Sequence, residues 1–190
     1  MMKRILLCGA IAVLCLSSSA QVVIPRTAEG RETPFGSATF SDAGHRSQQV
    51  YGSAEFPAHP ILIHELRFRP DSVHGGAFTT TVANIQINLS TTQRVPDALS
   101  ATFADNVGAD DTIVHQGPLT ISSRFTGPSG GPKDFDIIVP LSRPYLYDPA
   151  KGNLVIDTRN FSGASVPRLR LSGQSGVHPR HRAGSHGSTM

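Results

Sequence analysis

Two aspartates, Asp134 and Asp136, are the residues of this chain best placed for acid–base chemistry, because they stand two positions apart in an alternating segment. Alternate residues of a β-strand project from the same face, with Cα atoms about 6–7 Å apart. Two carboxylates at that separation could serve as the acid and base of a glycoside hydrolase. The alternative is structural: the pair forms the solvent face of a strand whose Phe135, Ile137 and Val139 point inward.

A second polar group, rich in the oxygen ligands that calcium prefers, surrounds the turn at Gly108. Its members are Asp105, Asn106, Asp110 and Asp111. Their spacing differs from that of an EF-hand loop. The sequence leaves two interpretations open: a calcium site, calcium being the one cofactor that the chain suggests, or a structural turn in which aspartates cap backbone N–H groups.

Tyr145 and Tyr147 are the best candidates for binding a ligand through aromatic rings. They stand two residues apart and would share one face of a strand. The chain contains only three tyrosines and no tryptophan, and this scarcity argues against a surface on which sugars stack. The alternative is that both rings pack in the core or at its rim.

Residues 127–131 (GPSGG) match the letters of the hydrolase nucleophile elbow, G-x-S-x-G. That motif requires a strand that leads through the serine into a helix. Here Pro128 precedes Ser129 and a β segment follows, so the sequence predicts a loop between strands.

These candidates need a scaffold, and two segments show the two-residue period of a β-strand clearly. Residues 61–69 predict that Leu62, His64, Leu66 and Phe68 share one face. Residues 79–90 alternate apolar and polar side chains, as expected of an antiparallel strand with one buried face. Its apolar positions are Val82, Ile85, Ile87 and Leu89.

Further short strands are predicted at 112–115 and 119–122, on either side of Gly117 and Pro118. Pro140 and Pro144 predict either an edge position or a crossover for residues 139–143, since proline cannot donate to the ladder. No segment carries a helical period over ten or more residues. The predicted fold class is therefore all-β, an antiparallel β-sandwich or jelly roll.

Composition divides the chain into four parts. Residues 1–20 combine Lys3 and Arg4 with an apolar run and small residues up to Ala20, which predicts a Sec-type signal peptide cleaved after Ala20. A polar lead-in segment follows at 21–44, the β-sandwich domain covers 45–163, and 164–190 forms a tail. The apolar run is too short for a transmembrane anchor, so we expect a secreted, extracellular or periplasmic protein.

Both cysteines, Cys8 and Cys15, lie in the predicted signal peptide. The exported chain would have no disulfide and no thiol ligand for a metal. Its sandwich must then be held by apolar burial and sheet hydrogen bonds.

Charge is unevenly distributed along the chain. Residues 21–163 carry eleven Arg or Lys and fourteen Asp or Glu, a net charge of −3, although the whole chain is +3. Nucleic-acid binding requires a clustered basic face, so we expect no nucleic-acid partner. The basic tail 164–190 has two interpretations: a disordered extension, since its composition cannot build a core, or a frameshift product that begins near Ser165.

Five segments of the sequence, taken together, resemble those of a known group of proteins. They are 85–92 (IQINLSTT), Phe103 with 106–112 (NVGADDT), 125–128 (FTGP) with 131–136 (GPKDFD), 147–149 (YDP) with 152–154 (GNL), and 159–163 (RNFSG). This combination resembles an uncharacterised group of secreted bacterial proteins, many of which end in a PEP-CTERM sorting signal. The resemblance covers residues 48–163 and implies an exported envelope or extracellular-matrix protein, with no established catalytic residues. The pattern here stops before the usual further strands and anchor, so we expect the last strands of the sandwich to be missing.

These observations favour a non-enzymatic secreted module with a binding or structural role, whose partners are extracellular polysaccharide or envelope components. The alternative is a carbohydrate-active or other hydrolytic enzyme that uses Asp134 and Asp136. The two hypotheses differ in one structural feature, because an enzyme of this kind requires two carboxylates that converge in a cleft. The oligomeric state is not specified by the pattern.

Overall fold

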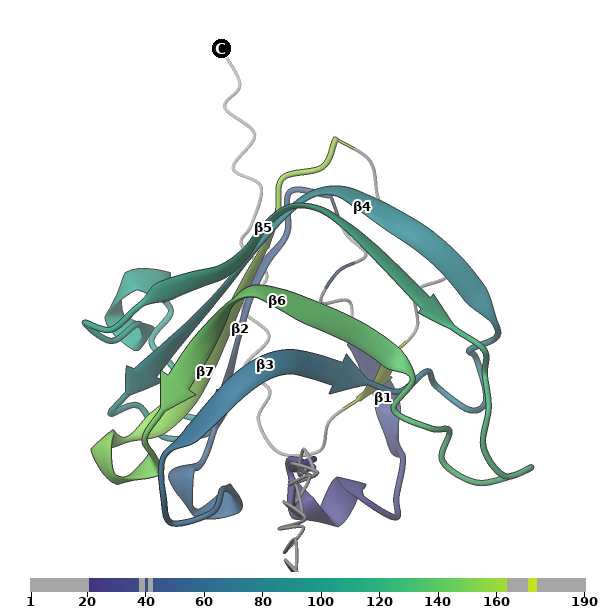
Figure 1. Ribbon diagram of the computed structural model, residues 1–190, viewed down its shortest axis with the longest axis horizontal. Helices are drawn as coiled ribbons and strands as arrows, with labels where there is room; N and C mark the ends of the chain where they lie inside the picture. Colours follow the sequence, from purple (N-terminus) through teal and green to yellow (C-terminus); the bar gives the residue numbers. More distant parts are fainter. Residues whose placement is uncertain (1–20, 38–39, 41–42, 164–170, 174–190) are drawn as a thin grey trace, which may run out of the picture.

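The computed structural model describes residues 21–37, 40, 43–163 and 171–173, and over this part the fold is all-β. A four-stranded and a two-stranded antiparallel sheet pack as a sandwich, which confirms the predicted class (Figure 1). The strands are β1 (Thr33–Ser37), β2 (Arg46–Tyr51), β3 (Ile61–Phe68), β4 (Phe78–Thr92), β5 (Thr112–Ser123), β6 (Ile137–Tyr147), β7 (Asn153–Asn160) and β8 (Leu171–Gly173). Single 3₁₀ turns occupy some of the loops: η1 (Arg26–Ala28), η2 (Ser53–Glu55), η3 (Phe103–Asn106) and η4 (Pro149–Lys151).

The four-stranded sheet has the order β2-β7-β4-β5, and the 15-residue β4 is one of its two central strands. The predicted inward face is confirmed, because the four apolar side chains are fully buried: Val82, Ile85, Ile87 and Leu89. They face the second sheet, where they meet Ile137, Val139 and Tyr147 in a single apolar core. The expected solvent face is wrong at Asn88 and Ser90, which are also buried. Strand β4 therefore anchors the sandwich.

The two-stranded sheet pairs β3 with β6, and its register shifts between Ile63 and Glu65. Ile61 and Ile63 pack against the core before the shift, and Leu66 and Phe68 do so after it. The predicted face is therefore wrong at Leu62 and His64, which are exposed, and right at Leu66 and Phe68. A β-bulge reverses which alternate residues face inward, and a regular two-residue period does not reveal it.

The edge position predicted from Pro140 and Pro144 is confirmed, since β6 pairs only with β3 among the described strands. The two short strands predicted around Gly117 are one strand, β5. Gly117 adopts a φ of +117° beside a register irregularity. Glycine tolerates this conformation, so the strand bends there without ending.

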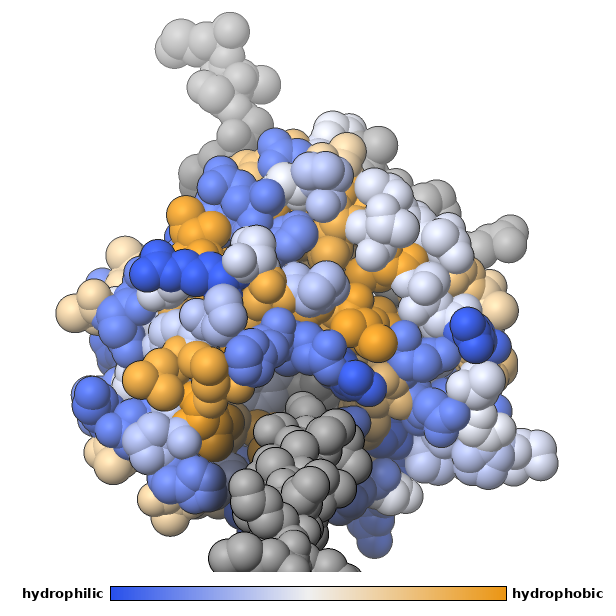
Figure 2. Space-filling view, in the orientation of Figure 1, coloured by the Kyte–Doolittle hydropathy of each residue, from blue (hydrophilic) through white to orange (hydrophobic). Residues whose placement is uncertain are grey.

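The outward face of the β3–β6 sheet carries the directly paired Leu62 and Leu146, which are 52% and 67% exposed. Polar side chains separate the apolar ones over the visible face of the molecule (Figure 2). A small exposed apolar pair of this kind is common on protein surfaces.

Two long loops lie at opposite ends of the sandwich (Figure 1). The β4–β5 loop, residues 93–111, contains η3, and the β5–β6 loop spans residues 124–136. Within the described residues, no helix is long and apolar enough to cross a membrane.

Strands β1 and β8 form a separate antiparallel pair, with Thr33 opposite Gly173 and Ser37 opposite Leu171. This pair joins the lead-in segment to three residues of the predicted tail. The predicted signal peptide and the rest of the tail lie outside the described residues.

Candidate functional site

A groove of about 1020 Å³ lies where β5 leads into β6. Its walls come from residues 21–29, the end of β3, the end of β5 and the β5–β6 loop. The groove is lined by four cationic and three acidic side chains: Arg67, Arg69, Arg124, Lys133, Glu29, Asp134 and Asp136. It is therefore a mixed-charge surface that includes both carboxylates predicted from the sequence.

Asp134 and Asp136 lie in the loop before β6, which begins at Ile137. Asp136 accepts hydrogen bonds from the Ser123 hydroxyl and the Arg124 backbone N–H, both at 2.8 Å, and so fixes the end of β5. Asp134 is exposed, and its own N–H donates to the Thr126 carbonyl at 3.0 Å. The expected shared strand face is wrong, because the turn residues of 127–132 and the Asp136 hydrogen bonds hold this segment as a loop.

Arg69 is the most unusual side chain of the groove. Although it carries a positive charge, it is only 6% exposed. Its guanidinium lies 3.7 Å from the centroid of the Phe135 ring, and its Nη2 donates to the Glu29 carbonyl at 3.3 Å. Its Nε and Nη1 are buried without a hydrogen-bond acceptor. Burial lowers the pKa of Arg69, and the charges of Glu32 and Asp134 partly oppose this effect.

A buried donor without an acceptor typically costs about 1–3 kcal/mol, and more when the group is charged. Native structures contain few such groups. The guanidinium of Arg69 is thus a reason to regard the groove as a binding site.

Of the other three cations of the groove, Arg67 and Arg124 are exposed and Lys133 is half-buried. Arg67 pairs with the exposed Glu65 at 2.6 Å. The ammonium of Lys133 donates to the Pro128 carbonyl at 2.9 Å and lies 4.8 Å from the centroid of Phe125. Arg124 is exposed and forms no ion pair within the described part of the chain. Exposed pairs of this kind are weak and can exchange with a ligand.

The predicted calcium ligands serve the β4–β5 loop. Asp110 accepts from the Thr91 N–H and the Tyr145 hydroxyl, both at 2.8 Å, and Asp111 accepts from the Asn88 amide at 2.8 Å. Burial alone raises the pKa of Asp110, but the Thr91 and Tyr145 hydrogen bonds outweigh it and hold the pKa below its usual value.

The other two candidates are also engaged. Asn106 is 1% exposed and its Oδ1 accepts from the Ser100 N–H, while Asp105 accepts from the Ser100 hydroxyl. Within the described residues, no three His, Cys, Asp or Glu side chains gather in a metal-binding group. The hydrogen bonds of these four side chains favour the structural turn.

We accordingly expect the thermal unfolding midpoint to stay within about 1 °C when calcium is exchanged for a chelator, because a ligand that binds the native state weakly adds little stability. Differential scanning calorimetry of the full chain would measure this. A rise of several degrees in calcium that Asp110→Asn abolishes would establish a calcium site instead.

Tyr145 and Tyr147 are 5% and 0% exposed, and both belong to the core. The Tyr147 hydroxyl donates to the Gly152 carbonyl at 2.8 Å, and its ring meets Phe56 edge-on at 4.7 Å. Burial raises the pKa of both phenols above its usual value. In this structure neither ring offers a free face for stacking a sugar.

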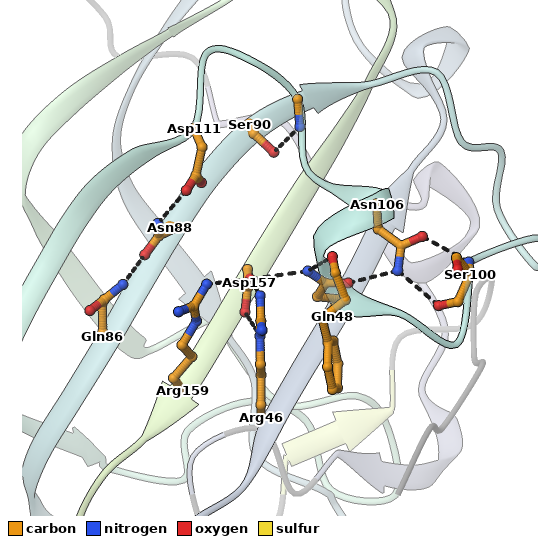
Figure 3. Close-up of polar contacts among 12 residues, drawn as sticks. Arg46, Gln48, Gln86, Asn88, Ser90, Ser100, Asn106, Asp111, Asp157 and Arg159 are labelled. Atoms are coloured by element: carbon orange, nitrogen blue, oxygen red, sulfur yellow. Dashed lines mark hydrogen bonds and ion pairs between the residues drawn. The ribbon is translucent and has the colours of Figure 1, made fainter. Parts of the chain in front are cut away.

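A buried polar network on the outer face of the four-stranded sheet was missed by sequence reasoning (Figure 3). The register places Gln48, Asp157 and Asn88 side by side on β2, β7 and β4. The β4–β5 loop covers them, as Asn106 donates to Gln48 at 2.9 Å and the Gly108 N–H donates to Ser90 at 3.3 Å. The sandwich thus has a third layer over part of one sheet.

Asp157 is the centre of this network and is 1% exposed. It accepts two hydrogen bonds from Arg46, one from Gln48 at 3.0 Å and one from Arg159 at 3.3 Å. Burial alone raises the pKa of Asp157, but these bonds and the charge of Arg46 outweigh it and lower the pKa. In the sequence, the burial of this acid is indicated by its position, because Asp157 directly follows the apolar run Leu154-Val155-Ile156.

Comparison of the chain with protein-family models, curated proteins and solved structures finds no match. The fold and the groove define the class: an all-β sandwich protein with a mixed-charge groove centred on a buried arginine.

Proposed function

We propose that this chain is a secreted, non-enzymatic β-sandwich module that binds a component of the cell envelope or extracellular matrix in the groove beside Arg69. The observation that supports the proposal best is the state of the Arg69 guanidinium, whose Nε and Nη1 are buried and lack acceptors. A ligand that supplies those acceptors would complete the site.

The two groove aspartates support a binding role more than a hydrolytic one. Both oxygens of Asp136 are engaged by the end of β5, whereas Asp134 is exposed to solvent. Hydrolysis by a carboxylate pair needs one group free to donate a proton and the other free to attack or to activate water. Asp136, whose two oxygens already accept hydrogen bonds, is poorly suited to donate a proton or to act as the nucleophile or base.

The test combines a binding assay with an activity assay on the full chain. We expect its migration in native gels to be retarded by at least one envelope or matrix polysaccharide, while no new reducing ends appear. Release of reducing ends that Asp134→Asn or Asp136→Asn abolishes would overturn the proposal in favour of the hydrolase.

Export is tested separately through the N-terminus. We expect the exported chain to have the intact mass of residues 21–190, because the small Ala20 at position −1 directs cleavage. Ala20→Gly keeps a small residue and should still be processed, whereas Ala20→Arg should block cleavage. Recovery of unprocessed wild-type chain from the cytoplasm would contradict secretion.

A further inference from the structure

We infer that the ligand of this groove is an acidic polysaccharide whose carboxylates pair with the guanidinium groups of Arg67, Arg69 and Arg124. The inference rests on the proposed binding function and specifies the chemistry of the ligand. It is carried by three features of the groove: a buried arginine without acceptors, further cations along one surface, and acidic and hydroxyl side chains among them.

Arg69 determines which ligand group fits the centre of the groove. The Phe135 ring covers one face of its guanidinium at 3.7 Å, so its remaining hydrogen-bonding capacity lies in the guanidinium plane, at Nε and Nη1. It forms no ion pair with any carboxylate of the described chain. Nε and Nη1 donate from different edges of the guanidinium, so each needs its own acceptor, and a carboxylate oxygen supplies one through a short charge-assisted hydrogen bond.

The arrangement of the other cations indicates a polymer. Arg67 comes from β3, whereas Arg124 and Lys133 come from the β5–β6 loop. With Arg69 they are four of the eleven cations in residues 21–163. A small monocarboxylate would occupy only one of these positions. A chain with carboxylates at intervals can meet several at once, which adds affinity through multivalency.

The acidic and hydroxyl groups of the groove favour a sugar polymer over other polyanions. Glu29, Asp134, Ser122 and Thr126 line the same surface and can accept hydrogen bonds from sugar hydroxyls. Four cations and three acids leave a net charge of only +1, which suits sparse carboxylates better than the dense phosphates of a nucleic acid. An acidic peptide has few hydroxyls with which to use these acceptors.

Binding at Arg69 requires a local movement. Its Nε and Nη1 are shielded from water, and Phe135 of the β5–β6 loop lies against the guanidinium. The loop is closed by the hydrogen bond from the Asp134 N–H to the Thr126 carbonyl. Ligand binding should therefore change the rate of amide hydrogen exchange in residues 125–136.

The experiment measures the affinity of the full chain for four probes at one salt concentration: polygalacturonate, dextran, poly-L-glutamate and duplex DNA. We expect polygalacturonate to bind at least about tenfold more tightly than the other three, since it alone combines carboxylates with hydroxyls. The variants are Arg69→Gln and Arg124→Gln, with Arg143→Gln as the matched control, because Arg143 is exposed and lies outside the groove.

Arg69→Gln and Arg124→Gln should each weaken polygalacturonate binding by about tenfold or more, and Arg143→Gln should change it by less than about twofold. Arg124 is exposed, so Arg124→Gln keeps the test valid if Arg69→Gln fails to fold. Loss of binding in Arg124→Gln, with altered hydrogen exchange at 125–136 in the wild type, would support the inference.

The remaining outcomes separate the two proposals. Equal binding of dextran and polygalacturonate, or wild-type affinity in the groove variants, would overturn the charge-based inference and leave the binding function standing. Equal or tighter binding of poly-L-glutamate or DNA would replace the polysaccharide with another polyanion. Binding of no probe and of no envelope or matrix fraction would overturn both proposals.

Discussion

Asp157→Asn is expected to lower the free energy of unfolding by about 3 kcal/mol, because it breaks a buried charge network. Asp157 is 1% exposed and receives hydrogen bonds from Arg46, Gln48 and Arg159. Asparagine has nearly the same shape, but it places an N–H₂ donor where one acceptor stood and removes the charge that offsets the two arginines. Urea unfolding followed by circular dichroism measures the loss.

Asp97→Asn is the matched control for this substitution. Asp97 is exposed and adopts a φ of 65°, a conformation that asparagine also tolerates. We expect its free energy of unfolding to stay within about 0.5 kcal/mol of the wild type. Equal effects of the two substitutions would show that the Asp157 network adds no stability.

The same network predicts a dependence on pH. The pKa of Asp157 is lowered in the folded state, so its stabilising contribution is complete above the unfolded-state pKa of about 3.9 and is lost as the pH falls through the folded-state pKa. The wild type should therefore lose stability more steeply than Asp157→Asn below about pH 4. Parallel pH profiles of unfolding free energy would contradict this assignment.

Gly108→Ala is expected to destabilise the protein by about 3 kcal/mol, because it pushes the β4–β5 loop away from the sheet. A Cβ at this position would lie 1.7 Å from the Thr91 carbonyl oxygen and 2.9 Å from its carbon. These are backbone atoms of β4, which cannot move without disturbing the central sheet. The loop must shift instead, which removes the Gly108 N–H from Ser90 and Asn106 from Gln48.

Gly76→Ala makes the same chemical change where space is free. No atom lies within 4 Å of a Cβ at Gly76, and its φ is outside the left-handed region. Stability should be unchanged or raised by up to about 1 kcal/mol, since alanine restricts the unfolded chain. Urea unfolding of both variants tests the argument, and a Gly108→Ala protein as stable as Gly76→Ala would show that the loop adapts freely.

Gly108 illustrates what a sequence pattern conveys and what it omits. The residue was expected to permit a sharp turn, and it does lie in the turn between η3 and β5. Its requirement for glycine arises from close contact with the Thr91 backbone, 17 residues earlier in the chain. Such a contact depends on where the loop docks, so local turn chemistry does not reveal it.

The groove likewise contains residues that the sequence pattern identifies and a residue that it misses. Asp134 and Asp136 were recognised as candidates because their spacing is a local property, and the structure does place both along one groove. Arg69 was not recognised, because its burial depends on Phe135, which is 66 residues away, and on the Glu29 carbonyl, which is 40 residues away. No period or motif in the sequence connects these three positions.

The all-β class and the buried face of β4 were readable from the sequence, because a strand with one buried face repeats every two residues. The sandwich order, the register shift beside His64 and the third layer over Asp157 were not. These features depend on pairing between distant segments, as in the hydrogen bonds that join Arg46 to Asp157 across 111 residues. Local alternation predicts which face of a strand is apolar. Which polar groups are buried together depends on the pairing of distant strands.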